Sequence, residues 1–423
     1  MRKVFRSQSL GGIDVTELKK IIKESVIGYG DGIKRVLLLP PDNTRSYSMA
    51  NDITNIFYEA MKDRYEVYVM PAIGSHMPMS NEEIQAFFGN SIPIERFLVH
   101  NWRSDAVKIG EIPSDFIREI SNGLIDYKID VEVNRRLVNN EFDLVISIGQ
   151  VVPHELTGMS NYSKNIFVGC GGFEMISRSH FLGSVCGVER TVGQIENPVR
   201  KIFDYAHEHY LTTMPILFVL TVTTVNIDKI QLEGIYIGDQ RSVFEEAACD
   251  SALKNVTYLN KPVRKVVTYL NEEDYKTTWV GDKAIYRTRN IIEKGGELII
   301  LAPGVRQFGD DLETDQIMRK YGYVGRESLL KMYHGDNYDD LRNNLAAIGQ
   351  LILGSTNELF NISYAVRHLT REEIEGVNFQ YLDYDEAINK YKPESLSEGL
   401  NLTLDNEEIY FIRNPGIGFW TIK

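Results

Sequence analysis

Short apolar runs alternate along the chain with stretches whose apolar residues recur at helical spacing. The apolar runs predict buried strands at residues 35–39, 65–70, 143–148, 216–225, 265–270 and 297–301. The helical spacing predicts helices between them, including residues 53–61, 199–209, 242–253 and 341–353. Because this alternation is typical of parallel sheets covered by helices, we predict an α/β fold with mostly parallel sheets flanked by helices.

The length of the chain indicates more than one domain. Its 423 residues exceed one ordinary core and suit two or three domains of roughly 150 residues each. Near residues 258–265, Asn260 and Pro262 interrupt a helical stretch before the next predicted strand. We therefore predict two domains, at residues 1–262 and 263–423, with the active site in the cleft between them.

Composition excludes several classes of partner. A net charge of −13 argues against a nucleic-acid or anionic-membrane surface, since both need clustered Lys and Arg. Cys170, Cys186 and Cys249 lie far apart without a CxxC pair, which fits neither a disulfide framework nor a zinc ribbon. The N-terminus lacks the apolar run of a signal peptide. We expect a soluble cytoplasmic protein without nucleic-acid or membrane partners, and an oligomer is left open.

Three predicted strands run into loops rich in turn residues, where ligands collect in open α/β sheets. The first loop, PDNTRS, places Asp42, Thr44 and Arg45 ahead of a helix, where a phosphate or carboxylate can be held. Asp42 alone is equally well explained as a turn residue or helix cap. The second loop carries His76, whose imidazole can exchange protons near neutral pH. A histidine that caps the loop explains the same pattern.

The third loop carries His154 and Lys164. A lysine there suits a phosphate contact, a Schiff-base amine or a covalent tether, although a solvated surface lysine is the commoner case. The GCGG segment that follows fits neither a dinucleotide nor a P-loop fingerprint. His180 has no partner His or carboxylate at metal-ligand spacing, so a metal there needs most of its ligands from elsewhere. A satisfied core histidine is the simpler interpretation.

One basic cluster stands out in the second half of this acidic chain. The segment TTWVGDKAIYRTR contains Trp279, Lys283, Arg287 and Arg289 just before a predicted strand. A solvated helix face explains these charges nearly as well as an anion-binding function.

Taken together, four segments resemble the nickel-pincer lactate racemase family in order and spacing. They are DNTRS, AIGSHMPMSNEE, GQVVPHELTGMSNYSKNIFVG and RSHFLG. Lys164 follows His154 by ten residues and His180 follows Lys164 by sixteen, as in that family. The resemblance extends from about Val36 to about His368 and is strongest in the first two hundred residues.

The resemblance implies a nickel-pincer nucleotide, pyridinium-3,5-bisthiocarboxylic acid mononucleotide nickel, attached covalently through Lys164. His180 matches the histidine that binds nickel, whose remaining ligands come from the sulfurs and a carbon of the cofactor. Asp42, Thr44 and Arg45 match the cofactor-binding loop. The N-terminal domain would then carry cofactor and catalysis, the C-terminal domain would complete the substrate cleft, and cofactor-assembly proteins of the host would be partners.

The family's chemistry implies a racemase or epimerase of 2-hydroxy acids. His76 and His154 match its two acid/base histidines, while Arg45, Lys283 and Trp279 match positions expected at the substrate. One histidine takes the 2-hydroxyl proton while the C2 hydrogen leaves as hydride to the cofactor, which avoids a carbanion beside the carboxylate.

The sequence also bears on the identity of the substrate. Trp279 and Val280 stand where lactate racemase has Tyr and Gln, and HNWRSD and TTWVGDKAIYRTR look like the branch assigned to sugar acids such as mannonate or gluconate. Trp102, Arg103 and Asp105 are candidate partners for a polyol. We therefore expect an isomerase that inverts C2 of a sugar acid. The alternatives are a racemase of lactate or another short 2-hydroxy acid, a divalent-metal isomerase or dehydratase with Lys164 as a substrate ligand, and a non-catalytic carrier.

Overall fold

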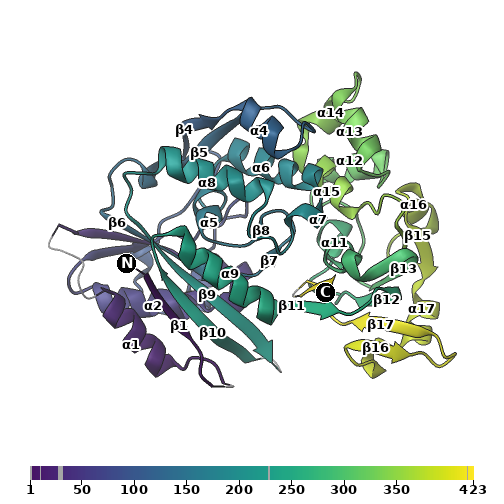
Figure 1. The fold of residues 1–423 in the computed structure, drawn as a ribbon, viewed down its shortest axis with the longest axis horizontal. Coiled ribbons are helices and arrows are strands. Elements are labelled where there is room, and N and C mark those ends of the chain that lie inside the picture. Colours follow the sequence, from purple (N-terminus) through teal and green to yellow (C-terminus); the bar gives the residue numbers. More distant parts are fainter. Residues whose placement is uncertain (1, 10, 27–31, 227–228, 417) are drawn as a thin grey trace. The chain divides into compact units, whose positions relative to one another are not determined.

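The computed structural model describes residues 2–9, 11–26, 32–226, 229–416 and 418–423. The chain forms two compact units (Figure 1). The first comprises Met1–Ser179 and Thr191–Asn255, and the second comprises His180–Arg190 and Val256–Lys423. Helix α6 (Phe173–Cys186) therefore begins in the first unit and ends in the second. The division into a cofactor domain and a substrate domain at residue 262, expected from the sequence, stays a prediction.

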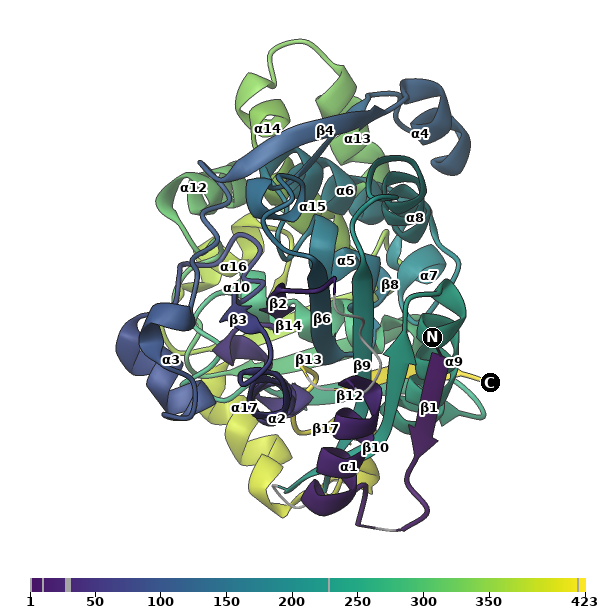
Figure 2. The same cartoon turned by 90° about the vertical axis from the view of Figure 1, so that its left-hand side faces the viewer.

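A six-stranded sheet in the order β1-β10-β9-β6-β2-β3 forms the centre of the first unit (Figure 2). Its strands are β1 (Arg2–Arg6), β2 (Arg35–Leu39), β3 (Glu66–Val69), β6 (Leu144–Gln150), β9 (Ile216–Asn226) and β10 (Lys229–Gly238). The pairs from β9 to β3 are parallel, whereas β10 and β1 are added antiparallel. The carboxyl ends of β2, β3 and β6 thus lie at one edge of the sheet.

Different helices cover the two faces of this sheet. They include α1 (Val15–Val26), α2 (Ala50–Met61), α5 (Ser163–Phe167), α8 (Pro198–Tyr210) and α9 (Arg241–Asn255). Leu217 and Val219 of β9 belong to the core cluster that includes α1 and α2. Phe218 points to the opposite face, where its ring centroid lies 4.3 Å from that of Tyr162, just before α5. Alternation along the strand buries both faces.

The first unit also contains short elements around the sheet. They are η1 (Asn43–Ser48), α3 (Asn81–Phe88), η2 (Ile94–Arg96), β4 (Ala106–Ile112), α4 (Ser114–Ile120), β5 (Ile129–Asn134), η3 (Arg135–Leu137), β7 (Pro153–His154) and β8 (Gly158–Met159). Strands β4 and β5 pair antiparallel, as do β7 and β8. The short helix α7 (Val188–Thr191) ends where the chain returns to the first unit.

The second unit contains another six-stranded sheet, in the order β15-β14-β13-β12-β17-β16. Its strands are β12 (Val263–Tyr269), β13 (Ile292–Ala302), β14 (Phe360–Val366), β15 (Gln380–Asp383), β16 (Gly399–Leu402) and β17 (Glu408–Ile412). All neighbours are parallel except β16 and β17. A separate parallel pair joins β11 (Val256–Leu259) to β18 (Phe419–Ile422).

Helices surround this second sheet. They are α10 (Thr278–Gly281), α11 (Lys283–Thr288), η4 (Arg289–Ile291), α12 (Leu312–Tyr321), α13 (Arg326–His334), α14 (Asp339–Asn343), α15 (Leu345–Gly354), α16 (Arg371–Gly376), α17 (Tyr384–Tyr391) and η5 (Pro393–Ser395). One core cluster packs Tyr384 and Tyr391 of α17 against Val267, Leu301 and Phe411 of the sheet.

The structure confirms an α/β fold with mostly parallel sheets flanked by helices. The single helix predicted at residues 341–353 is wrong, because Asn344 separates α14 from α15 and its side chain accepts a hydrogen bond from the Ala347 amide. The helical stretch before the predicted boundary ends at Asn255, so Asn260 and Pro262 follow a strand instead.

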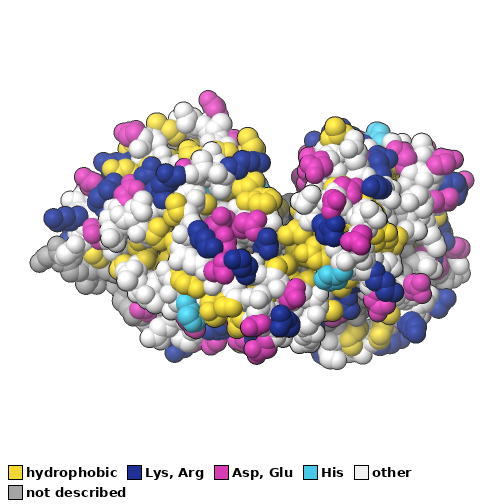
Figure 3. Space-filling view, turned by 90° about the horizontal axis from the view of Figure 1, so that it is seen from above, with side chains coloured by type: hydrophobic (Ala, Val, Ile, Leu, Met, Phe, Trp, Pro, Cys, Tyr) yellow, Lys and Arg dark blue, Asp and Glu magenta, His cyan; other side chains and the backbone are white. Residues whose placement is uncertain are grey.

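All three cysteines are free of disulfides. No described helix is both long and apolar enough to cross a membrane. On the face drawn in Figure 3, Lys and Arg side chains are interspersed with Asp and Glu.

Candidate functional site

Asp42 is the buried centre of the loop that follows β2. It caps η1 and is only 4% exposed. Its Oδ1 accepts hydrogen bonds from the Thr44 amide, at 3.2 Å, and the Thr44 hydroxyl, at 2.5 Å. Arg45 in turn donates from Nη1 to the Thr44 hydroxyl oxygen at 3.1 Å. Asp42 is therefore more than the turn residue that the sequence alone allowed.

Asp42 also orients His76, which follows β3. The Oδ2 atom of Asp42 lies 2.6 Å from Nδ1 of His76, whose side chain is 45% exposed. Burial alone would raise the pKa of Asp42, but hydrogen bonds from His76 and Thr44 and the charge of Arg45 lower it overall. Because an ionised carboxylate only accepts, it holds a proton on Nδ1 of His76 and leaves Nε2 as the proton acceptor.

A strained turn presents Lys164. Asn161 and Tyr162 both have positive φ, at 62° and 59°, and such a backbone is unfavourable for a bulky side chain. The Tyr162 ring offsets this cost by stacking on Phe244 of α9 at 5.2 Å and contacting Phe218 of β9. The turn is thus held by burial of an aromatic ring.

Asn165 ties the next turn of α5 to the central strands. Its amide donates to the Leu39 carbonyl at 3.1 Å and to the Ser147 hydroxyl at 2.9 Å. Leu39 ends β2 and Ser147 lies in β6, so the helix that carries Lys164 is fixed to both strands that precede the candidate loops. The Gly74 amide of the His76 loop likewise donates to Gly169, after α5.

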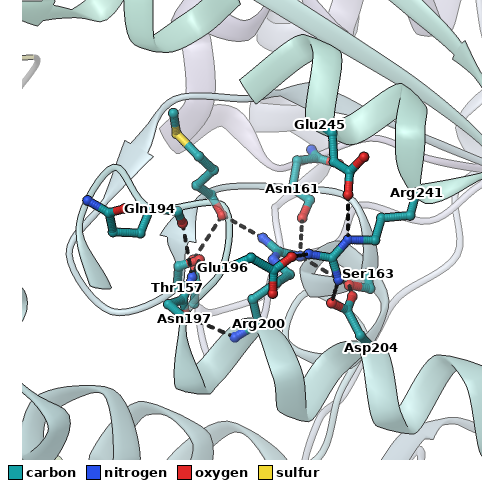
Figure 4. A network of polar contacts seen from close by, with 11 residues as sticks. Thr157, Asn161, Ser163, Gln194, Glu196, Asn197, Arg200, Asp204, Arg241 and Glu245 are labelled. Carbon is teal, nitrogen blue, oxygen red and sulfur yellow. Dashed lines mark hydrogen bonds and ion pairs between the residues drawn. The ribbon is translucent and has the colours of Figure 1, made fainter. Parts of the chain in front are cut away.

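Arg200 of α8 holds the segment before Lys164 from the other side (Figure 4). Its buried guanidinium donates to the carbonyls of Met159, at 2.6 Å, and Asn161, at 3.3 Å, and to the Ser163 hydroxyl at 3.0 Å. The guanidinium also lies over the Phe244 ring, 4.3 Å from its centroid. These contacts fix three residues around the turn with one side chain.

The amine of Lys164 is prepared to react as a base or nucleophile. Burial lowers its pKa to about 7, and the nearby charges of Arg45 and Arg200 contribute to the decrease. In the part of the chain that the structure describes, no hydrogen bond or ion pair involves the amine. A half-buried lysine with this pKa differs from the solvated surface lysine that the sequence left open.

Backbone amides determine which nitrogen of His154 carries the proton. Its Nδ1 accepts from the amides of Leu156, at 3.2 Å, and Thr157, at 3.4 Å. An accepting Nδ1 places the proton of the neutral ring on Nε2. The two candidate histidines of the first unit therefore have opposite tautomers, with Nε2 unprotonated in His76 and protonated in His154.

The glycine-rich segment after α5 has a structural explanation. A Cβ atom at Gly171 would overlap the Phe167 carbonyl, and one at Gly172 would overlap Glu132. His100, which the sequence analysis did not single out, donates from Nε2 to the Gly171 carbonyl at 3.1 Å. The segment therefore packs tightly against β5 and the loop before β4.

Trp102 and Arg103 form a small platform near the start of α6. The rings of Trp102 and Phe173 stack with centroids 5.9 Å apart, and Arg103 lies 3.9 Å from the Trp102 centroid. The Asp105 carboxylate forms a hydrogen bond within its own loop, where it accepts from the Asn101 amide at 3.0 Å. Its role as a polyol partner stays a prediction.

The other predicted site residues, His180, Trp279 and Lys283, belong to the second unit. His180 is half-buried in α6, and its carbonyl accepts from Ser184, which faces Gly349 of α15. The adjacent Gln350 donates to the Trp279 carbonyl at 3.1 Å. Helix α15 therefore contacts both segments. Among the described residues, no group of three or more His, Cys, Asp or Glu side chains could hold a metal ion.

A buried carboxyl group, missed by sequence reasoning, supports the segment with Trp279 and Lys283. Asp282 accepts hydrogen bonds from the hydroxyls of Tyr323, at 2.7 Å, and Tyr364, at 2.9 Å, and from the amide of Gln350, at 2.9 Å. Burial raises its pKa to about 7, although these hydrogen bonds oppose the increase. Only the tertiary structure brings these donors together.

Arg287 and Arg289, which follow on α11 and η4, have structural partners. Arg287 donates to the Gly418 carbonyl at 3.0 Å. Arg289 is buried, donates to the carbonyls of Leu353 and Ser355, and forms an ion pair with Glu189 at 3.3 Å. The interpretation of this segment as a solvated helix face is therefore wrong for Arg289.

Comparison with known proteins adds family information to this geometry. Residues 16–192 match the lactate racemase N-terminal domain. Lactate racemase of Thermoanaerobacterium thermosaccharolyticum is 23% identical over 320 residues, which cover 71% of this chain and 69% of that protein. Lactate racemase of Lactiplantibacillus plantarum is 25% identical over 228 residues, covering 52% of this chain and 48% of its relative.

Two solved structures share the fold. A Thermotoga maritima protein superposes with a TM-score of 0.82 and 23% identity, covering 99% of this chain and 100% of its own. The lactate racemase apoprotein of Thermoanaerobacterium thermosaccharolyticum gives a TM-score of 0.68 and 17% identity, covering 98% and 95%. The domain match and the curated relatives indicate an isomerase of the racemase class. They support the lactate racemase family, because residues 16–192 of this chain match the N-terminal domain of that family.

The lowered pKa of Lys164 predicts selective acylation. At pH 7, acetic anhydride should modify Lys164 at least about tenfold faster than exposed Lys19, because about half of the Lys164 amines are uncharged, compared with well under 1% for an ordinary lysine. Peptide mass mapping over a time course measures both rates. Lys164→Arg should leave the rate at Lys19 unchanged. Equal rates of acylation at the two lysines would contradict the lowered pKa of Lys164.

The raised pKa of Asp282 predicts a decrease in stability with rising pH. Between about pH 4 and pH 7 the unfolded carboxyl is ionised while the folded one keeps its proton, so the free energy of unfolding should fall by a few kcal/mol, on the order of 1.4 per pKa unit. Urea unfolding at several pH values measures this slope. Asp282→Asn should flatten it, whereas Asp385→Asn, at an exposed position of α17, should not.

Proposed function

We propose that the protein is a racemase or epimerase that inverts C2 of a 2-hydroxy acid with the help of a lysine-tethered nickel-pincer nucleotide. The observation that carries the proposal is the pairing of His76 with buried Asp42 in the same unit as Lys164, whose amine has a pKa of about 7. The match of residues 16–192 to the lactate racemase N-terminal domain supports it independently.

The residues around Lys164 suit the proposed cofactor. An amine that is largely uncharged near neutral pH can form an amide with an activated carboxyl group. Among the described residues Arg45 forms no ion pair, so its guanidinium retains capacity for a phosphate or carboxylate. Lys164, Asp42, Thr44 and Arg45 would hold the cofactor, and His180 would bind its nickel. When bound, the cofactor would supply the acceptor for the C2 hydride.

The protein's own contribution is proton transfer and positioning. His76, with Nε2 unprotonated, is set to take the 2-hydroxyl proton, and Asp42 stabilises the imidazolium that results. To return a proton to the keto oxygen from Nε2, His154 would act in its imidazolium form, because a neutral imidazole is too weak an acid. One histidine would then begin a turnover neutral and the other protonated, these charge states would be exchanged at its end, and proton exchange with solvent would restore them.

Two substrate classes remain as proposals. A sugar acid such as mannonate or gluconate follows from the sequence resemblance, and the stacked Trp102 and Phe173 with adjacent Arg103 offer a surface for a longer, hydroxylated chain. Lactate or another short 2-hydroxy acid fits the two relatives named lactate racemase at least as well. A screen of both classes for C2 inversion separates them.

Inversion should proceed with retention of the C2 hydrogen and depend on both histidines. With C2-deuterated substrate in ordinary water, the inverted product should keep its deuterium, and His76→Ala and His154→Ala should each reduce the rate in both directions at least about 100-fold. Chiral chromatography with mass detection measures both quantities. His209→Ala, on α8, is the control. Loss of the label at the rate of inversion would exclude hydride transfer.

The cofactor should be detectable by mass. Protein made in cells that assemble the nickel-pincer nucleotide should carry a nucleotide-sized addition on Lys164, and Lys164→Ala should lose both the addition and the activity while the chain still folds. His180→Ala should keep the organic addition but contain less nickel. An active protein with unmodified Lys164 would instead favour an isomerase or dehydratase that uses a simple divalent metal.

A further inference from the structure

A pocket opens in the first unit, away from the candidate active site. It has a volume of about 940 Å³ and is lined by the first residues of β6 and β9, by α8, and by the turn between β10 and α9. The candidate loops follow the carboxyl ends of β2, β3 and β6, whereas this pocket lies at the amino ends of β6 and β9. Its volume is within the range of small-molecule sites.

Tyr162 gives the pocket a polar group without a protein partner. The residue is 4% exposed and lines the pocket, and its hydroxyl has no hydrogen-bond partner among the residues that the structure describes. Burial raises the pKa of the hydroxyl to about 12, so it is a neutral donor and acceptor. The hydroxyl is therefore open to the pocket, and a ligand with a polar atom at this point can form a hydrogen bond with it.

The charged residues of the pocket are predominantly acidic. Asp204, Glu208 and Asp239 line it together with one cationic side chain, Arg241. Arg241 is already matched by Asp204, Glu196 and Glu245 (Figure 4). Glu208 has no ion pair in the described part of the chain. The wall therefore favours a cation and disfavours an anion.

The remaining lining is mainly apolar. Leu144, Leu211, Met214 and Leu217 contribute to it beside the ring of His207. Burial lowers the pKa of His207, so the ring is uncharged at neutral pH. An apolar floor, an acidic wall and one buried phenol define the chemistry of the ligand.

We propose that this pocket binds a small organic cation, an ammonium group on an aliphatic or aromatic body. The ammonium group would lie near Glu208, the body would occupy the apolar floor, and a polar atom would pair with the Tyr162 hydroxyl. This site is additional to the proposed racemase activity and does not depend on it. A ligand here would contact the strained residue that precedes the helix of Lys164.

Three probes with six carbon atoms each and different charge test the proposal. We expect hexylammonium to bind the full-length protein in isothermal titration at least about tenfold more tightly than hexanol, and hexanoate not to bind measurably. Tyr162→Phe should weaken hexylammonium about fivefold, and Glu208→Gln should weaken hexylammonium but not hexanol. Glu59→Gln, at an exposed position of α2, should change neither.

Two results would overturn the proposal. Hexanoate that binds as tightly as hexylammonium would exclude a cation site, and unchanged affinity in Glu208→Gln would exclude the acidic wall as its cause. If Tyr162→Phe does not fold, as judged by circular dichroism, the proposal is still tested by the affinities of the three probes for the unmodified protein and by the effect of Glu208→Gln. None of these measurements involves 2-hydroxy acids, so a failure here is distinguishable from a failure of the proposed racemase function.

Discussion

The placement of Lys164 depends on one buried cation. The guanidinium of Arg200 donates to Met159, Asn161 and Ser163, and thereby fixes a turn that the intrinsic preferences of Asn161 and Tyr162 would not favour. Burying an arginine without a direct carboxylate partner is costly, and burial lowers its pKa to about 9. That cost is partly offset because three polar groups of the turn are satisfied at once, whereas Nε of Arg200 has no hydrogen-bond partner among the described residues.

The two buried aspartates show how surroundings separate chemically identical groups. Asp42 keeps its negative charge because His76, Thr44 and Arg45 compensate for burial, and its pKa is lowered. Asp282 is surrounded by neutral donors, and its pKa is raised to about 7. The first therefore suits an electrostatic role beside a histidine, whereas the second suits a structural role in the segment with Trp279 and Lys283.

The sequence was sufficient for the parallel core and for the loops that follow it. Apolar runs predicted β2 and β6 closely, and turn residues marked the loops in which Asp42, His76 and Lys164 were proposed as site residues. Arg200 was not predictable, because its spacing in α8 is that of any helical residue and its three acceptors lie about 40 residues earlier. Asp282 was missed for the same reason, since its donors come from the loop after α12, from α15 and from β14. The break at Asn344 depends on one side-chain cap within a continuous helical pattern.

The path of α6 has a consequence for biosynthesis. Residues His180–Arg190 are translated before the rest of the second unit, yet they pack with it, for example through Phe181, whose ring centroid lies 4.9 Å from that of Tyr333. A ribosome-bound chain that has emerged only as far as Asn255 therefore holds the sequence of the first unit together with an apolar segment that lacks its partners. Folding of that segment must wait for the downstream sequence, so the two units are not independent in the order of their synthesis.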